Sequence, residues 1–201
     1  MYLIGLTGGI AAGKSTVAAR WVEQGAIEID ADQLAREAVA AGTDGLAQVV
    51  AQFGESILAS DGTLDRAALG SIVFADPEKR LQLEAIIHPR VKQLAKQRIS
   101  ALPENSIVIY NVPLLVEAAV DLDFDKVVTV EAPANKQIDR LIKIRGLSRE
   151  EAERRVSAQA SAAQRANAAD VILNSNQDLA LLLKDADNLW RSIVAEAAEQ
   201  D

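Results

Sequence analysis

A short run of residues near the amino terminus has the composition and spacing of a site for phosphate groups. From Gly8 to Gly13 the chain is rich in glycine and alanine, and Lys14 and Ser15 follow directly. A tight turn of this kind directs backbone N–H groups inward, and together with the N-terminus of a following helix they form a concave anion site. Lys14 is expected to place its ammonium on the β- and γ-phosphates of a nucleoside triphosphate, and Ser15 to add its hydroxyl to the oxygen shell of Mg²⁺. The residues expected to bind the nucleotide are Gly8, Gly9, Ile10, Ala11, Ala12, Gly13, Lys14, Ser15 and Thr16, the last of which is also expected to cap the helical turn.

The segments on either side of this run agree with a nucleotide site. An apolar stretch, Leu3 to Leu6, precedes it and a helix-like stretch follows it, which is the strand, loop and helix order of a P-loop. The alternative is a glycine-rich turn with a chance lysine and serine behind it, and the strand context favours the P-loop. A P-loop indicates that the protein binds a nucleotide, but it does not indicate which molecule accepts the phosphoryl group.

Four further apolar runs predict the rest of a sheet. Each is short, rich in β-branched residues and separated from the next by helix-period segments, as expected of buried parallel strands. With the first run, the five predicted strands are Tyr2–Leu6, Ala26–Ile29, Ile107–Val112, Lys126–Val130 and Asp170–Leu173. The fold class that follows is α/β, with a doubly wound, five-stranded parallel sheet. Trp21 and Trp190 lie in helix-like stretches and are expected to pack in its core.

Two helical segments interrupt the strands. Residues 33–100 show helical patterns with almost no strand signal, and residues 135–167 are helical and rich in arginine. The sequence therefore predicts a nucleotide-binding core of residues 1–32, 101–134 and 168–201, with a helical insertion at 33–100 and a lid at 135–167. Arginines delivered by a closing lid can stabilise the charge of phosphoryl transfer. The alternative is that most of these arginines lie on a solvent-exposed helical face, where they form ion pairs with acidic residues four positions away.

Composition limits the classes of function. The 201 residues hold 21 Lys and Arg against 29 Asp and Glu, a net charge of −8, which argues against a nucleic-acid partner because phosphate backbones need a basic surface. With no Cys and one His, thiolate and multi-histidine metal centres are excluded, so any metal must be held by oxygen. The amino terminus enters a strand at once, and no run approaches the ~20 apolar residues that span a bilayer. We therefore expect a soluble, cytoplasmic protein with no membrane partner.

Two carboxylates follow the second predicted strand. Asp30 and Asp32 lie at its end, and open α/β sheets bind ligands at the carboxyl edge. If the strand continues through both residues, their side chains share one face. One carboxylate could then orient or deprotonate an attacking hydroxyl while the other holds Mg²⁺ through water. The alternative for one of them is the N-cap of a helix that begins near Gln33. Asn111 ends the third strand, where a P-loop enzyme often has a metal-binding Asp.

Several motifs spread over nearly the whole chain together resemble the dephospho-CoA kinase family. Each is weak alone, but their order and spacing are specific. They are Leu6-Thr7-Gly8-Gly9-Ile10, Lys14-Ser15-Thr16, Asp30-Ala31-Asp32 with Ala35-Arg36, Asp61-Gly62-Thr63-Leu64-Asp65-Arg66, Ile87-His88-Pro89, Val112-Pro113-Leu114-Leu115-Val116-Glu117, Gly146-Leu147-Ser148, Gln159 and Ala169-Asp170-Val171-Ile172 with Asn174. The resemblance implies a P-loop kinase of the nucleoside-monophosphate-kinase type, which uses ATP and Mg²⁺ to phosphorylate the ribose 3′-hydroxyl of dephospho-CoA in the last step of coenzyme A biosynthesis.

The resemblance also implies roles for particular residues. The insertion at 33–100 would be the substrate domain, and Asp32 would be the catalytic base. Lys14 and the lid residue Arg140 would neutralise the transferring phosphoryl group, while Arg140 and Asn174 would contact the nucleotide. The residues implied in substrate binding are Asp32, Arg36, Arg66, His88, Pro89, Leu114, Leu115 and Glu117.

The chain departs from the family pattern at two places. Ala11 and Ala12 replace the usual Gly-Ser in the loop, which keeps the backbone donors but restricts positive φ. Ile144 stands where a second lid arginine is expected, and Arg145 could compensate for it.

Alternatives stay open for two residues and for the activity. His88 precedes a proline at a predicted helix end, so it could cap that helix or face the ligand, and no catalytic role is expected. Asn174 could contact adenine or cap its own loop. The nearest rival activity is a P-loop kinase of another small alcohol or of a nucleoside monophosphate. A nucleotide-dependent switch would carry a guanine-reading Asn-Lys-x-Asp signature or an apolar run ending in a metal-binding Asp, and neither is evident.

Overall fold

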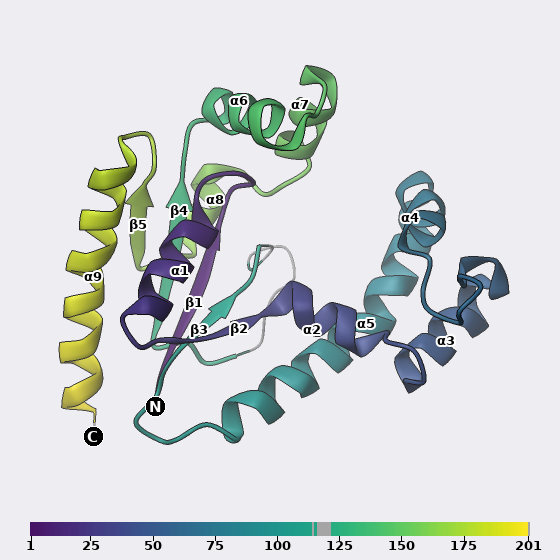
Figure 1. The fold of residues 1–201 in the computed structure, drawn as a ribbon, viewed down its shortest axis with the longest axis horizontal. Coiled ribbons are helices and arrows are strands. Elements are labelled where there is room, and N and C mark those ends of the chain that lie inside the picture. Colours follow the sequence, from purple (N-terminus) through teal and green to yellow (C-terminus); the bar gives the residue numbers. More distant parts are fainter. Residues whose placement is uncertain (114, 116–121, 201) are drawn as a thin grey trace. The chain divides into compact units, whose positions relative to one another are not determined.

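The computed structural model describes residues 1–113, 115 and 122–200. These residues form a five-stranded sheet in which every pairing is parallel and the strand order is β2-β3-β1-β4-β5 (Figure 1). The strands are β1 (Tyr2–Gly8), β2 (Ile27–Asp30), β3 (Ile107–Asn111), β4 (Lys126–Glu131) and β5 (Val171–Asn174). The predicted α/β fold is confirmed, and each strand end lies within two residues of its expected position. Because β1 extends to Gly8, the central strand passes directly into the glycine-rich loop.

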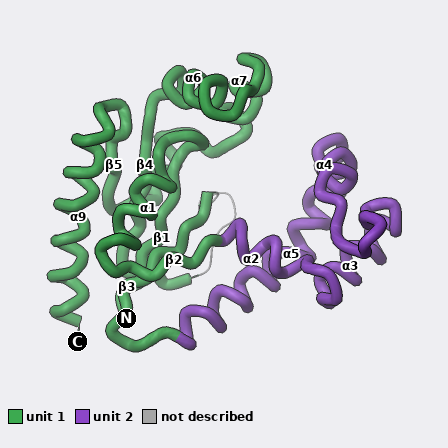
Figure 2. The backbone as a smooth tube through the Cα atoms, in the orientation of Figure 1, with its two compact units in different colours: residues 1–30, 102–201 green, residues 31–101 purple. Residues whose placement is uncertain are grey.

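The chain divides into two compact units (Figure 2), one of residues 1–30 and 102–201 and the other of residues 31–101. The first unit holds the sheet with α1 (Lys14–Glu23), α6 (Ala134–Arg145), α7 (Arg149–Ser157), α8 (Ala162–Asn167) and α9 (Leu179–Glu199). The second holds α2 (Ala31–Ala38), α3 (Asp44–Phe53), the 3₁₀ helix η1 (Glu55–Ile57), α4 (Arg66–Ala75) and α5 (Pro77–Ser100). The segment expected to be a lid, 135–167, therefore belongs to the same unit as the sheet.

The core of the first unit lies between the sheet and the helices α1 and α9. One buried cluster joins the strands to Val17 of α1 and Ile193 of α9. Trp21 and Trp190 stack with their ring centroids 6.0 Å apart, and the indole N–H of Trp21 donates to the carbonyl of Ala186 at 2.9 Å. The prediction that both tryptophans are core residues is confirmed, since they are 0% and 5% exposed.

The second unit is built of helices around a small core of its own. The buried residues of this core come from α3, α4, η1 and the turn after α2, and are Val39, Val49, Ile57, Leu69 and Val73. Asp65 and Asp76 cap the N-termini of α4 and α5 by accepting backbone N–H groups, and Pro77 opens the first turn of α5. The cap side chains give acceptors to N–H groups of the first helical turn, and the proline lacks an N–H that would have no partner there. These local signals fix where the two helices begin.

Helix α5 continues through His88 and Pro89, so the expectation that His88 stands at a helix end is wrong. A proline inside a helix has no N–H to donate and crowds the preceding turn. Close to Pro89, the guanidinium of Arg90 donates to the carbonyl of Ile86 at 2.5 Å. This contact lies in the turn from which the proline removes a backbone hydrogen bond. Helix α5 also packs against α2, α3 and α4. Tertiary packing of this kind outweighs the local cost of the proline.

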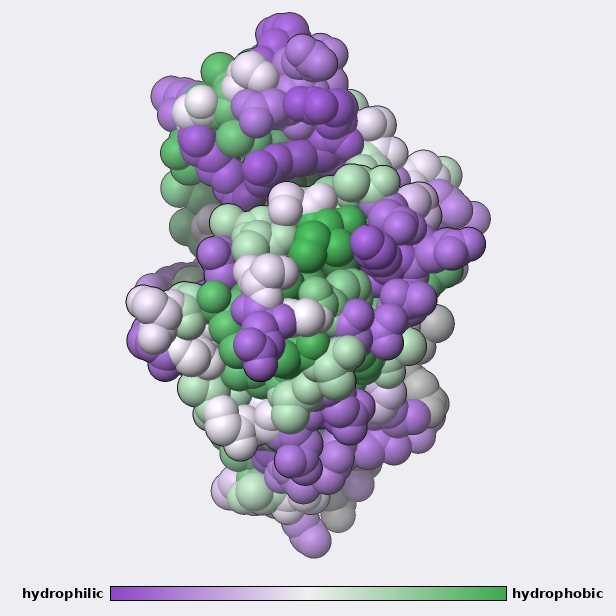
Figure 3. Space-filling view, turned by 90° about the vertical axis from the view of Figure 1, so that its right-hand side faces the viewer, coloured by the Kyte–Doolittle hydropathy of each residue, from purple (hydrophilic) through white to green (hydrophobic). Residues whose placement is uncertain are grey.

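The surface carries mixed side chains. In the described residues, no helix is long and apolar enough to cross a lipid bilayer. The face drawn in Figure 3 is mostly hydrophilic, with apolar residues gathered near its middle. Exposed apolar side chains include Phe74 and Leu81 of the second unit and Ile144 of α6. Single exposed apolar side chains such as these three are ordinary for globular proteins.

We expect a carboxylate near the end of α9 to make stability depend on pH. Glu196 accepts hydrogen bonds from Lys126 and from the Tyr2 hydroxyl, and these bonds lower its pKa from near 4.5 to about 2. Because the pKa is lower in the folded state, the stabilisation is present above about pH 4.5 and is lost as the pH falls toward 2. The side chain of Glu196 is 38% exposed, so Glu196→Gln should lower the free energy of unfolding by only about 1 kcal/mol at pH 7. Urea unfolding at several pH values measures this loss, which should disappear near pH 2, while Glu199→Gln on the same helix is the control. A loss that stays constant down to pH 2 contradicts the assignment.

Candidate active site

The parallel strands bring polar residues to one edge of the sheet. Gly8 at the end of β1 pairs with Val130 of β4, and Asp30 at the end of β2 pairs with Asn111 at the end of β3. Open α/β sheets bind their ligands outside this carboxyl edge. Beside it, burial raises the pKa of the Tyr110 phenol, and the charge of Asp30 raises it further. The phenol therefore stays neutral at physiological pH.

The loop after β1 has the backbone form of an anion site. The N–H of Ala12 donates to the carbonyl of Gly9 at 2.9 Å and closes a turn whose third residue, Ala11, has a φ of 56°. Gly13, with a φ of 104°, precedes α1 as its N-cap. Within the described part of the chain, the N–H groups of Ala11, Gly13 and Ser15 donate to no protein acceptor. Unpaired backbone donors in a loop that leads to a helix N-terminus are the groups that bind phosphate.

Two expectations about this loop need correction or refinement. Thr16 does not cap the helix, because Gly13 occupies the N-cap position and makes no side-chain cap; the N–H of Thr16 instead donates to the carbonyl of Gly13 at 3.0 Å within the first turn. Ala11 adopts the left-handed conformation that its Cβ disfavours, at a cost of roughly 1–2 kcal/mol. The loop therefore keeps its backbone form although alanine has replaced the usual glycine.

Lys14 and Asn111 form part of a chain of polar contacts at the sheet edge. The Lys14 ammonium donates to Oδ1 of Asn111, and Nδ2 of Asn111 donates to a carboxylate oxygen of Glu28 on β2. Asn111 is 5% exposed, at the position where sequence reasoning noted that an Asp is common. The neutral amide of Asn111 adds no negative charge beside the lysine, whereas a carboxylate at this position would.

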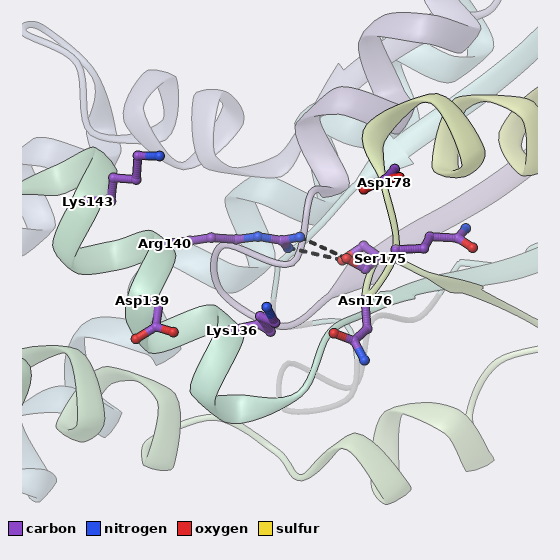
Figure 4. A pocket seen from close by; sticks show the side chains of 8 residues that line it. Lys136, Asp139, Arg140, Lys143, Ser175, Asn176 and Asp178 are labelled. Carbon is purple, nitrogen blue, oxygen red and sulfur yellow. Dashed lines mark hydrogen bonds between the residues drawn. The ribbon is translucent and has the colours of Figure 1, made fainter.

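Arg140 of α6 contacts the same loop. Its guanidinium donates to the carbonyls of Ala11 at 3.1 Å and Ala12 at 3.3 Å. It also donates to the hydroxyl of Ser175 at 3.1 Å and to its carbonyl at 2.8 Å (Figure 4). Ser175 is 1% exposed and donates its own hydroxyl to the carbonyl of Ala12. The structure thus places Arg140 against the phosphate-binding loop, and its contact with phosphates stays a prediction.

A pocket of about 390 Å³ opens beside Arg140, between α6 and the segment that precedes α9 (Figure 4). This volume lies in the range of small-molecule sites. Its lining residues are Lys136, Asp139, Arg140, Lys143, Ser175, Asn176, Gln177 and Asp178. Asn174 lies outside this lining and accepts the N–H of Asn176 at 2.9 Å, as in the loop-capping alternative. Sequence reasoning missed Ser175 and Asn176, although their place just after the last strand was an available signal.

Asp30 and Asp32 do not share a strand face. Strand β2 ends at Asp30 and α2 begins at once with Ala31. The condition for a shared face, a strand that continues through Asp32, is therefore not met, and the helix starts two residues before the expected Gln33. Residues from Ala31 onward include good helix formers, and a carboxylate in the first turn suits the helix dipole. Asp32 occupies that first turn, and Arg36 follows four residues later on the same exposed face of α2.

The other predicted substrate residues are divided between the two units. Arg66 begins α4, and His88 and Pro89 lie on α5, all three with exposed side chains in the second unit. Leu115 belongs to the first unit, where its Cδ1 approaches the backbone of Gly5. Leu114 and Glu117 lie outside the described residues. The substrate roles of these residues stay predictions.

The fold and the loop define the class of the protein as a P-loop kinase. Two solved shikimate kinases, from Acinetobacter baumannii and Bacteroides thetaiotaomicron, share this fold with a TM-score of 0.54 at 15% identity. A crystal structure from Thermus thermophilus matches much better, with a TM-score of 0.83 and 34% identity over 97% of each chain.

A family model described as dephospho-CoA kinase matches residues 2–181, and the chain belongs to that family. The dephospho-CoA kinase of Streptomyces avermitilis is 45% identical over 98% of this chain and 96% of the relative, and that of Thermobifida fusca is 46% identical over 88% of each. The family assignment makes the chain a phosphotransferase of the last step of coenzyme A biosynthesis, with ATP as co-substrate and a small molecule as acceptor.

We expect the strain at Ala11 to be measurable. Ala11→Gly removes the left-handed penalty of roughly 1–2 kcal/mol but adds about 0.5–1 kcal/mol of unfolded-chain entropy, so it should stabilise the protein by about 0.5–1 kcal/mol. Ala12→Gly is the matched control, because Ala12 is fully buried and is not at positive φ. That change should destabilise by about 1 kcal/mol or more through the lost methyl burial and the added backbone freedom. Urea unfolding of both variants tests the pair, and equal destabilisation by both would refute the assignment of strain.

Proposed function

We propose that this chain transfers the γ-phosphoryl group of ATP to the ribose 3′-hydroxyl of dephospho-CoA, giving coenzyme A and ADP. The observation that carries the proposal is that the N–H groups of Ala11, Gly13 and Ser15 have no acceptor among the described residues, in a chain of the dephospho-CoA kinase family. A triphosphate supplies the anionic oxygens that these donors need. The acidic, cysteine-free composition supports a place in the cytoplasm.

Lys14 and Arg140 supply the positive charge near the transferred group. In the structure Lys14 donates to a neutral amide, and the acceptors of the Arg140 hydrogen bonds at the loop are neutral oxygens. Arg140 can share these contacts with phosphate oxygens at little electrostatic cost, because its acceptors at the loop carry no charge. The charge that develops on the phosphoryl oxygens in the transition state is then met by groups already in place, which is the main contribution of a protein to phosphoryl transfer.

The residues at the loop suit Mg²⁺ held jointly with the nucleotide. Among the described residues, no group of three or more His, Asp or Glu side chains could hold a metal ion by itself. The exposed Ser15 hydroxyl is a hard oxygen donor in the first turn of α1, and Mg²⁺ commonly combines one or two protein oxygens with phosphates and water. Mg²⁺ would there neutralise phosphate charge and orient the triphosphate.

Asp32 is our candidate for the base that receives the hydroxyl proton, and Arg36 on the same helical face is a candidate contact for an anionic group of dephospho-CoA. Arg66, His88, Pro89 and Leu115 extend the proposed substrate surface. The pocket beside Arg140 is the proposed site of the nucleoside of ATP, because α6 and the segment after β5 line it next to the phosphate-binding loop.

The substrate proposal predicts turnover that requires both substrates. Purified protein with Mg·ATP should release ADP only when dephospho-CoA is present, as followed by a coupled assay. Shikimate and nucleoside monophosphates are the comparison acceptors. A folded protein that releases no ADP above background with dephospho-CoA would contradict the proposal.

The base assignment predicts a large effect of Asp32→Asn. Loss of general base catalysis should lower kcat by at least about a hundredfold. The matched control is Asp44→Asn, since Asp44 also lies exposed in the first turn of a helix of the second unit. That variant should keep kcat within about twofold. If Asp32→Asn keeps kcat within about tenfold of wild type, a difference of only ~1.4 kcal/mol, Asp32 is not the base.

The metal proposal predicts that Mg²⁺ binds only with nucleotide. Isothermal titration of Mg²⁺ into the protein alone should give no saturable heat below millimolar concentrations, whereas a non-hydrolysable ATP analogue should create a saturable site. Ser15→Ala should raise the Mg²⁺ concentration for half-maximal activity by about tenfold or more. A saturable Mg²⁺ site in the nucleotide-free protein would show that the protein holds the metal by other residues.

A further inference from the structure

Gln159 connects a distant part of the chain to the phosphate-binding loop. Its side-chain oxygen accepts the backbone N–H of Ile10 at 2.7 Å, across 149 positions of sequence. Gln159 lies in the short connection between α7 and α8. The proposed function assigns no role to this residue.

The backbone around Gln159 is anchored on both sides. On one side, the N–H of Gln159 donates to the carbonyl of Val156 at 3.4 Å, at the end of α7. On the other, the carbonyl of Ala160 accepts from the Arg165 guanidinium at 2.5 Å. Arg165 is 4% exposed and makes a two-pronged ion pair with Glu131, at 2.6 and 2.7 Å. The connection is therefore tied to the carboxyl end of β4.

The same anchor lies against the start of the loop. β4 pairs with β1, so Glu131 follows the residue paired with Gly8. A Cβ added at Gly9 would lie 2.6 Å from the side-chain nitrogen of Gln137 and 3.0 Å from a guanidinium nitrogen of Arg165. The first half of the loop is therefore packed closely against side chains of α6 and α8.

We propose that Gln159 is a positioning residue for the phosphate-binding loop. By taking the Ile10 N–H, its side chain fixes the peptide unit that enters the turn from Gly9 to Ala12. Fixing that peptide holds the strained turn at Ala11, so that the N–H groups of Ala11 and Gly13 converge on the phosphates without further ordering. Preorganised donors bind an anion more tightly because their conformational entropy is already lost. Gln159 thus acts on ATP through Ile10, and this inference rests on the proposed function.

The test compares two glutamine-to-methionine changes in one segment. Gln159→Met keeps the length of the side chain and removes the acceptor for Ile10. Gln164→Met is the matched control, because Gln164 is exposed on α8 and its side chain accepts, among the described residues, only from Ser161 in a local capping box. We expect Gln159→Met to raise the KM for ATP about fivefold or more and to leave the KM for dephospho-CoA within twofold. Gln164→Met should leave both KM values within twofold.

A second measurement follows the hydrogen bond itself. The Ile10 amide of ¹⁵N-labelled, nucleotide-free protein should exchange its proton slowly in the wild type and in Gln164→Met, and at least about tenfold faster in Gln159→Met. Gln159→Glu keeps an acceptor oxygen and should restore slow exchange at Ile10. This readout needs no turnover, so it tests the contact even if dephospho-CoA proves to be the wrong substrate, which wild-type ADP release reveals separately.

Three results overturn the proposal. They are an unchanged KM for ATP in Gln159→Met, an equal rise of both KM values together with a lower melting temperature, and unchanged exchange of the Ile10 amide. The second result assigns Gln159 to general stability, and the third shows that the contact does not hold the loop in solution.

Discussion

In the part of the chain that the structure describes, the phosphate-binding loop keeps several backbone N–H groups without protein partners, and the surrounding structure serves that requirement. Unpaired backbone donors are costly in a folded protein unless water or a ligand satisfies them. The loop tolerates this state because its other polar groups are held. Its carbonyls at Ala11 and Ala12 accept from Arg140, and its N–H groups at Ile10 and Ala12 have acceptors in Gln159 and Gly9. The N–H groups of Ala11, Gly13 and Ser15 are the donors that we propose for phosphate.

The way in which positive charges are paired separates binding groups from structural ones. Arg165 meets the carboxylate of Glu131 in a buried two-pronged ion pair, so its charge is cancelled and it serves to hold the connection between α7 and α8 to β4. The guanidinium of Arg140 instead donates to neutral carbonyl and hydroxyl oxygens at the loop, which leave its charge in the site. An acidic protein with anionic substrates needs this distinction, since its overall charge of −8 repels ATP.

Much of the fold could be predicted because its signals are local. The apolar runs, the glycine-rich loop and the helical segments depend on neighbours a few residues apart, and the parallel sheet follows from their alternation. The wrong expectations arose where packing overrides a local rule. Pro89 was expected to end a helix, yet α5 continues through it. A face shared by Asp30 and Asp32 required a strand that continues through both, but α2 starts immediately after Asp30.

The amino-acid sequence alone determined the family, the nucleotide loop and the order of strands and helices, since motif spacing and hydrophobic period are properties of short stretches of chain. Tertiary structure alone decided which partners hold the loop. Ser175 and Gln159 reach it from more than 140 residues away in the sequence, and no local pattern specifies a contact over that distance. Such contacts depend on the parallel pairing of β1 with β4 and on the packing of α6 and α8 beside them, which exist only once the sheet has formed.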